Sequence, residues 1–169
     1  MKTPAVDRTA CVNVAFLPLQ ILLRAHPEWR GFPGVVVDKD KPQGIIEWAN
    51  KRALAQCIRP GMRYAAALGL STELRGATVE APAIQRAIDK LQTRLWEFSP
   101  RVEAAEASPG VFWLDASGLQ HVFHSLPDWL ELIVAALREA GFHASVALGY
   151  TKFGAYAAAV SGRGDYARL

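Results

Sequence analysis

The sequence has few cysteines and no long apolar run. Its 169 residues include two cysteines, Cys11 and Cys57, and neither belongs to a CxxC pair or lies beside a histidine at a metal-ligand spacing. This usage is typical of a cytosolic protein with reduced thiols. The first ten residues, MKTPAVDRTA, lack the apolar core of a signal peptide, and no stretch approaches 18 uninterrupted apolar residues. These absences argue against a secreted or membrane-spanning protein, and we expect a cytoplasmic location.

The surplus of charge is also small. The formal net charge is +3, with 21% charged and 51% hydrophobic residues. This composition is that of an ordinary globular protein and argues against disorder. A surplus of three positive charges permits a polyanionic partner but does not require one.

The common motifs of enzymes are missing. The sequence contains no GxxxxGK[ST] loop, no GxGxxG after a strand, no HExxH and no GxSxG. His121 and His124 are three residues apart, but their turn-rich stretch offers no third ligand, so we expect loop residues rather than a metal site. Asp115 could be catalytic, or its carboxylate could accept backbone N–H bonds from the Ser117–Gly118 turn, which the local pattern favours.

The apolar residues predict alternating strands and helices. The clearest helix is 83–97, where isoleucines and leucines recur at helical spacing. A second is 127–140, for which Ser125 provides a cap, Pro127 fits the first turn and Gly141 fits the C-terminal end. The five tryptophans are scattered, which favours packing over a platform for stacking bases. The remaining predicted strands are 11–17, 34–38, 44–48, 76–82, 110–117 and 142–150, and the remaining helices are 18–26, 49–57, 63–70 and 152–160.

This order of elements predicts an α+β fold, in which helices cover one face of a mixed or antiparallel sheet. Several segments also resemble, in order, the Y-family (translesion) DNA polymerases. The family patterns concerned are NPxLxGxPVxV, GVRSGMPxxEAL, FSPxVE, AFLDLTG and SVGIAxNKxLAK. They correspond here to HPEWRGFPGVVV (26–37), IRPGMRYAAAL (58–68), FSPRVE (98–103), VFWLDASG (111–118) and REAGFHASVALGYTKFGAYAA (138–158).

The resemblance implies a division into the first two polymerase domains. The palm would comprise residues 11–32 and 81–169, and a small fingers insertion would comprise residues 33–80. The thumb and little-finger domains of the family would be absent from this chain.

The resemblance also implies that the metal-binding carboxylates are lost. Family members hold two metal ions with an Asp on the first strand and an Asp-Glu pair on the second, because phosphoryl transfer needs charged oxygen ligands. The first Asp corresponds here to Asn13, and the pair corresponds to Gly110 and Val111. The stretch before them is two residues longer than the family pattern, and Glu106 would need a further shift to reach a metal position.

The positions that contact the nucleotide have changed as well. By the same resemblance, the sugar-selecting aromatic becomes Pro18, and the Tyr, Arg and Lys of the fingers become Lys51, Leu54 and Ala55. The first Lys of the later palm motif is kept as Lys152, whereas the second becomes Tyr156. We therefore expect a protein without polymerase activity, bound metal or cofactor.

Among Y-family relatives, this combination most resembles the ImuB type. That likeness implies a bacterial, non-catalytic hub of a mutagenic SOS repair complex. Its partners would be a replicative-type error-prone polymerase, a RecA-like accessory protein and the sliding clamp, bound through regions mostly beyond this chain. Weak, sequence-independent DNA binding would use phosphate contacts from Lys51, Arg52, Arg59, Arg63 and Lys152.

Two other hypotheses remain open. One is an active or weakly active translesion polymerase with substitute metal ligands. The other is an unrelated α+β binding module, which would be favoured if the first strand did not lie beside the 111–115 strand.

Overall fold

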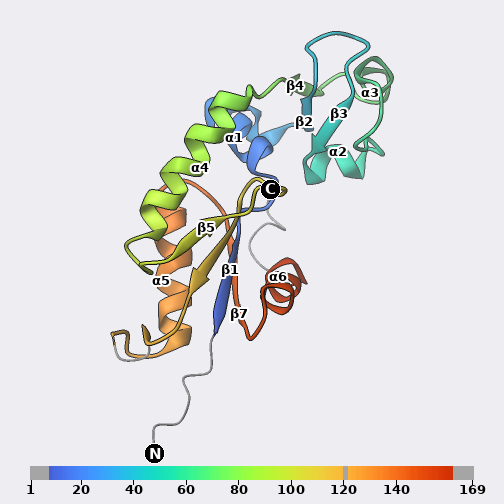
Figure 1. Ribbon diagram of the computed structural model, residues 1–169. Helices are drawn as coiled ribbons and strands as arrows, with labels where there is room; N and C mark the ends of the chain where they lie inside the picture. Colours follow the sequence, from blue (N-terminus) through green and yellow to red (C-terminus); the bar gives the residue numbers. More distant parts are fainter. Residues whose placement is uncertain (1–7, 120–121, 162–169) are drawn as a thin grey trace, which may run out of the picture. The chain divides into compact units, whose positions relative to one another are not determined.

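The computed structural model describes residues 8–119 and 122–161 (Figure 1). These residues form two compact units. Unit 1 takes the described residues up to Ala15 and from Ala87 onward, and unit 2 takes Phe16–Arg86. The predicted boundaries of the palm and fingers come from the family resemblance and differ from the boundaries of these two units. The palm and fingers boundaries stay a prediction. Among the described residues, no helix has the length and apolar character needed to cross a membrane.

Unit 1 is built on an antiparallel sheet of four strands in the order β5-β6-β1-β7. Central β1 lies directly beside β6, as the polymerase resemblance requires and the unrelated-module hypothesis does not. The sequence did not predict β5, because it has three residues and none of them is fully buried. The strands are β1 (Thr9–Asn13), β5 (Val102–Ala104), β6 (Val111–Asp115) and β7 (Ser145–Gly149).

Helices α5 (Leu126–Glu139) and α4 (Ala81–Leu95) lie on one side of this sheet, and α6 (Lys152–Ser161) lies on the other (Figure 1). The predicted ends of α5 are confirmed. The Ser125 hydroxyl accepts the N–H of Asp128 at 3.1 Å, and Gly141 has a φ of 82° just beyond the last turn. Glycine adopts that left-handed backbone without steric cost, so the helix stops there.

Strand alternation divides the apolar residues between the two faces of the sheet. Cys11 and Val111 point towards α6, where they pack with Ala155 and Ala159. These small alanine side chains allow α6 to lie close to the strands. The opposite face holds the larger apolar side chains, which include the fully buried Phe112 and Leu114.

The burial of Cys11 leads to a test with a thiol reagent. Burial raises the pKa of Cys11 to about 12, so the reactive thiolate is almost absent at pH 8. Cys57 is exposed. We expect Ellman's reagent to titrate one thiol per native chain and both thiols in guanidinium. The Cys57→Ser variant should show no fast reaction, and rapid labelling of that variant would contradict the burial of Cys11.

Unit 2 contains a second, mixed sheet in the order β3-β2-β4, in which β2 is antiparallel to β3 and parallel to β4. Central β2 packs on both faces, which explains its uninterrupted run of valines: Val35 and Val37 join one apolar cluster, and Val36 joins another. The elements are α1 (Leu17–Ala25), the 3-10 turn η1 (Pro27–Gly31), β2 (Gly34–Val37), β3 (Ile46–Ala49), α2 (Lys51–Ala55), α3 (Tyr64–Leu70) and β4 (Arg75–Ala77).

Candidate functional site

The end of β1 brings together the three positions that the resemblance aligned with metal ligands. Asn13 pairs with Val111 of β6 on one side and with Ser145 of β7 on the other. The next residue, Val14, donates its N–H to the Gly110 carbonyl at 2.8 Å. Asn13 is 8% exposed, and the Ser145 hydroxyl donates to the carbonyl of Ala159 at 2.7 Å. The polar side chains at these positions are therefore an amide and a hydroxyl.

The turn between β5 and β6 explains the glycine at this position. The N–H of Ala105 donates to the Val111 carbonyl at 2.9 Å, and the N–H of Val111 donates to the Ser108 carbonyl at 3.0 Å. Gly110 has a φ of 96°, a backbone conformation that residues other than glycine rarely adopt. Glu106 lies in the same turn with an exposed side chain. Within residues 8–119 and 122–161, no three His, Cys, Asp or Glu side chains are grouped to hold a metal ion.

The other carboxylates of this hairpin have partners elsewhere. Both oxygens of Glu103 lie 2.7 Å from Lys152 Nζ. Asp115 Oδ1 accepts the N–H of Ser117 at 2.8 Å, which confirms the predicted turn contact, and Oδ2 lies 3.4 Å from Arg101 Nη1. The hydrogen bonds from Ser117, followed by the weaker effect of Arg101, lower the pKa of Asp115.

Asp115 is also at the wrong end of the sheet to act with Asn13. It lies opposite Thr9, whereas Asn13 lies opposite Val111. Four residues of strand separate these two ends by about 13 Å. A shared metal ion needs oxygen ligands within about 2.0–2.6 Å of its centre, so Asp115 cannot contribute to a site at Asn13.

The two positions on α6 that the resemblance aligned with nucleotide contacts are engaged with the sheet. The ring of Tyr156 lies against that of Trp113, with centroids 6.4 Å apart and planes at 54°. Lys152 Nζ lies 5.5 Å from the centre of the Trp113 ring, in addition to its ion pair with Glu103. The lysine that matches the first position of the family motif is thus paired with a carboxylate of the same unit.

In unit 2, Asn50 caps the short helix that carries the altered positions of the fingers motif. Its side-chain oxygen accepts the N–H of Ala53 at the start of α2, at 2.9 Å, and its nitrogen donates to the Phe32 carbonyl at 2.9 Å. The following Lys51, Leu54 and Ala55 are exposed on α2. Arg52, Arg59 and Arg63 are exposed as well, whereas Pro18 is buried in the first turn of α1.

Sequence reasoning overlooked Phe16, which immediately precedes α1. Its φ of 53° is unusual for a bulky residue, and its ring, 41% exposed, lies edge-on to Trp48 at 5.8 Å. No sequence signal predicts this backbone.

Of the two histidines weighed as metal ligands, His124 is exposed and His121 lies outside the described residues.

Comparison with known proteins identifies the family. Residues 14–159 match the model of the IMS group, described as the impB/mucB/samB family. The chain belongs to the impB/mucB/samB family. No curated protein matches it significantly in sequence.

Two solved structures share the fold of this impB/mucB/samB chain. DinB from Sulfolobus solfataricus superposes with a TM-score of 0.76 at 19% identity, over 92% of this chain and 46% of DinB. The insertion ternary complex of Dbh DNA polymerase superposes with a TM-score of 0.75 at 19% identity, over 92% and 46% of the two chains. The predicted α+β palm and fingers fold of a Y-family polymerase is thus confirmed. The expectation that helices cover only one face of the sheet is wrong for unit 1, because α6 packs on the face opposite α4 and α5. The chain spans less than half the length of these structures.

Proposed function

We propose that this chain is a catalytically inactive polymerase homologue of the ImuB type that serves as a DNA-associated scaffold in a bacterial mutagenic SOS repair complex. The proposal depends mainly on one observation. At the end of β1, where the family pattern calls for metal-binding carboxylates, the aligned side chains are those of Asn13, Gly110 and Val111.

The chemistry of phosphoryl transfer explains why these residues matter. Two metal ions must neutralise the triphosphate and activate the attacking hydroxyl, and magnesium binds weakly without charged oxygen ligands. An amide oxygen carries no net charge, and neither glycine nor valine has an oxygen in its side chain. The protein would therefore hold neither metal ion firmly.

The nucleotide contacts support the same proposal. Tyr156 replaces a lysine and lies against Trp113, and Lys152 is paired with Glu103. In α2, Leu54 and Ala55 offer no charge to a triphosphate. The packing residues of the fold remain while its charged contacts have changed, which is consistent with a fold retained for a purpose other than catalysis.

The scaffold role would combine DNA contact with protein partners. Lys51, Arg52, Arg59 and Arg63 are exposed in unit 2 and suit phosphate contacts that do not read sequence. The replicative-type error-prone polymerase, the RecA-like accessory protein and the sliding clamp would bind mostly through regions beyond this chain. Such DNA binding should be weak and should fall steeply with added salt.

Primer extension with magnesium or manganese tests the absence of catalysis. We expect no nucleotide incorporation above background, with an active Y-family polymerase as the positive control. Glu106 favours one alternative, because it is an exposed acid in the turn beside Gly110. Incorporation that disappears in Asn13→Ala or Glu106→Gln would reveal substitute metal ligands and contradict the proposal. Incorporation that survives both changes would contradict it too.

A further inference from the structure

A hollow of about 560 Å³ opens on unit 1, away from the positions aligned with metal ligands. Its lining includes Thr9 and Asp115, which lie opposite each other at the far end of β1 and β6 from Asn13 and Val111. The volume falls within the range of about 300–1,000 Å³ that is common for ligand sites. We propose that this hollow binds single-stranded nucleic acid, whose bases stack on aromatic side chains in and around it.

Two tryptophans line the hollow, and two further exposed aromatic residues neighbour its lining residues, one by contact and one along the chain. Trp96 and Trp113 line it, and Trp96 is 54% exposed. Tyr150, 70% exposed, adjoins it through Arg8, whose guanidinium lies 5.7 Å from the centre of the Tyr150 ring. Phe153, 81% exposed, follows the lining residue Lys152. The expectation that the tryptophans serve packing holds for the buried Trp129 but does not account for Trp96.

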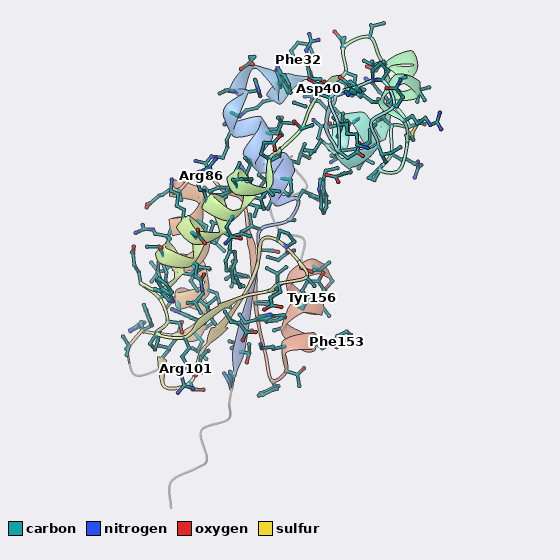
Figure 2. The ribbon with its side chains drawn as sticks, turned by 45° about the horizontal axis from the view of Figure 1, so that its top comes forward. Phe32, Asp40, Arg86, Arg101, Phe153 and Tyr156 are labelled. Atoms are coloured by element: carbon teal, nitrogen blue, oxygen red, sulfur yellow. The ribbon has the colours of Figure 1, made fainter. Side chains whose placement is uncertain are left out.

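The two aromatic residues of α6 differ in their surroundings. Figure 2 shows Phe153 projecting outward from α6, whereas Tyr156 packs against Trp113. Phe153 has no ring partner among the described contacts of this unit and leaves most of its surface to solvent. Water is an unfavourable environment for a phenyl ring, and a nucleobase would cover it.

The charges around the hollow favour stacking over phosphate attraction. The lining contains three basic residues and two acidic ones, which leaves an excess of one positive charge. They are Arg8, Arg101, Lys152, Glu103 and Asp115. Lys152 is held by Glu103, but the Arg101 side chain is 82% exposed and only loosely paired with Asp115 at 3.4 Å. Arg101 can therefore turn to a phosphate at little cost, because exposed ion pairs are weak.

Single strands fit these observations better than duplex DNA or an acidic peptide. In a duplex the faces of the bases are covered by their neighbours, whereas in a single strand they can stack on protein rings. An acidic peptide would need a larger positive excess than the hollow offers. This proposal is independent of whether the protein catalyses polymerisation.

The first test uses a fluorescent oligothymidylate of roughly 12 nucleotides, a length within the range of known single-strand sites. The protein should bear Ala at Lys51, Arg52, Arg59 and Arg63, so that the unit 2 cations do not contribute. In that background, Trp96→Ser with Tyr150→Ser should weaken binding at least about tenfold, because Trp96 lines the hollow, Tyr150 contacts its lining residue Arg8, and each stacked base contributes about 1–3 kcal/mol. Leu132→Ser is the matched control, because Leu132 is a 49% exposed apolar residue of α5 outside the hollow.

Salt and tryptophan emission supply two further readouts. With about one phosphate contacted, affinity should fall only about threefold between roughly 50 and 200 mM salt, whereas four contacts would give about fiftyfold. Trp96→Phe should keep the affinity and reduce the quenching of tryptophan fluorescence by the oligonucleotide. Equal binding by the Trp96/Tyr150 variant, equal affinity for a duplex of the same length, or no binding in the four-alanine background would each overturn the proposal. If the four-alanine change abolished binding and the aromatic changes had no effect, the result would support DNA contacts in unit 2 and not in the hollow.

Discussion

Replacing Trp129 with alanine is expected to lower the free energy of unfolding by about 3–5 kcal/mol, the range seen when a large buried side chain is truncated. Trp129 is completely buried in α5. Its indole Nε1–H donates to the carbonyl of Phe98 at 3.0 Å, and its ring lies 6.3 Å from that of Phe123. Truncation removes this packing and leaves a partly buried carbonyl without its donor.

Urea unfolding followed by circular dichroism measures the loss. Leu132→Ala is the control on the same helix, and because Leu132 is 49% exposed its effect should stay within about 0.5 kcal/mol. Trp129→Phe keeps most of the apolar volume but not the hydrogen bond, so it should cost about 1–3 kcal/mol. A Trp129→Ala variant as stable as the Leu132→Ala control would contradict the assigned core.

Replacing Gly149 with alanine should displace α6 from the sheet and cost about 1–3 kcal/mol, as overpacking does elsewhere. A methyl group on Gly149 would lie 2.7 Å from the backbone nitrogen of Ala155 and 3.0 Å from its Cα. Both are backbone atoms, so no side-chain rotation can relieve the overlap. The whole helix must therefore move away from β7.

Gly69 offers a matched control for this change. A Cβ at Gly69 meets no atom within 4 Å, and the residue lies inside α3. Gly69→Ala should raise the free energy of unfolding by about 0.5–1 kcal/mol, because alanine favours the helix. The midpoint of thermal or urea unfolding should thus fall for Gly149→Ala and rise for Gly69→Ala. An unchanged midpoint for Gly149→Ala would show that α6 packs less closely than described.

The comparison of sequence and structure shows which features local patterns could predict. α4 and α5 were predictable because their apolar residues recur at helical spacing and because α5 has a serine cap and a terminal glycine. β2 was predictable from its valines. β5 was missed, since three partly exposed residues carry no alternation that distinguishes them from a loop.

The candidate site was predictable only through the family resemblance. Asn13 and Val111 are far apart in sequence, and strand pairing alone brings them together. One local signal was present but not used: Pro109–Gly110 is a turn dipeptide, and it marks the tight turn just before β6. The exposure of Trp96, Tyr150 and Phe153 could not be predicted, because aromatic residues in such segments usually pack in the interior.

The backbone of Gly110 restricts which side chains this turn can carry. An aspartate at a φ of 96° would strain the turn by about 1–3 kcal/mol before any cation bound to it. An acid at position 110 would therefore make the hairpin less stable whether or not it reached a cation. Installing a carboxylate at this end of β6 would require a turn with a different backbone.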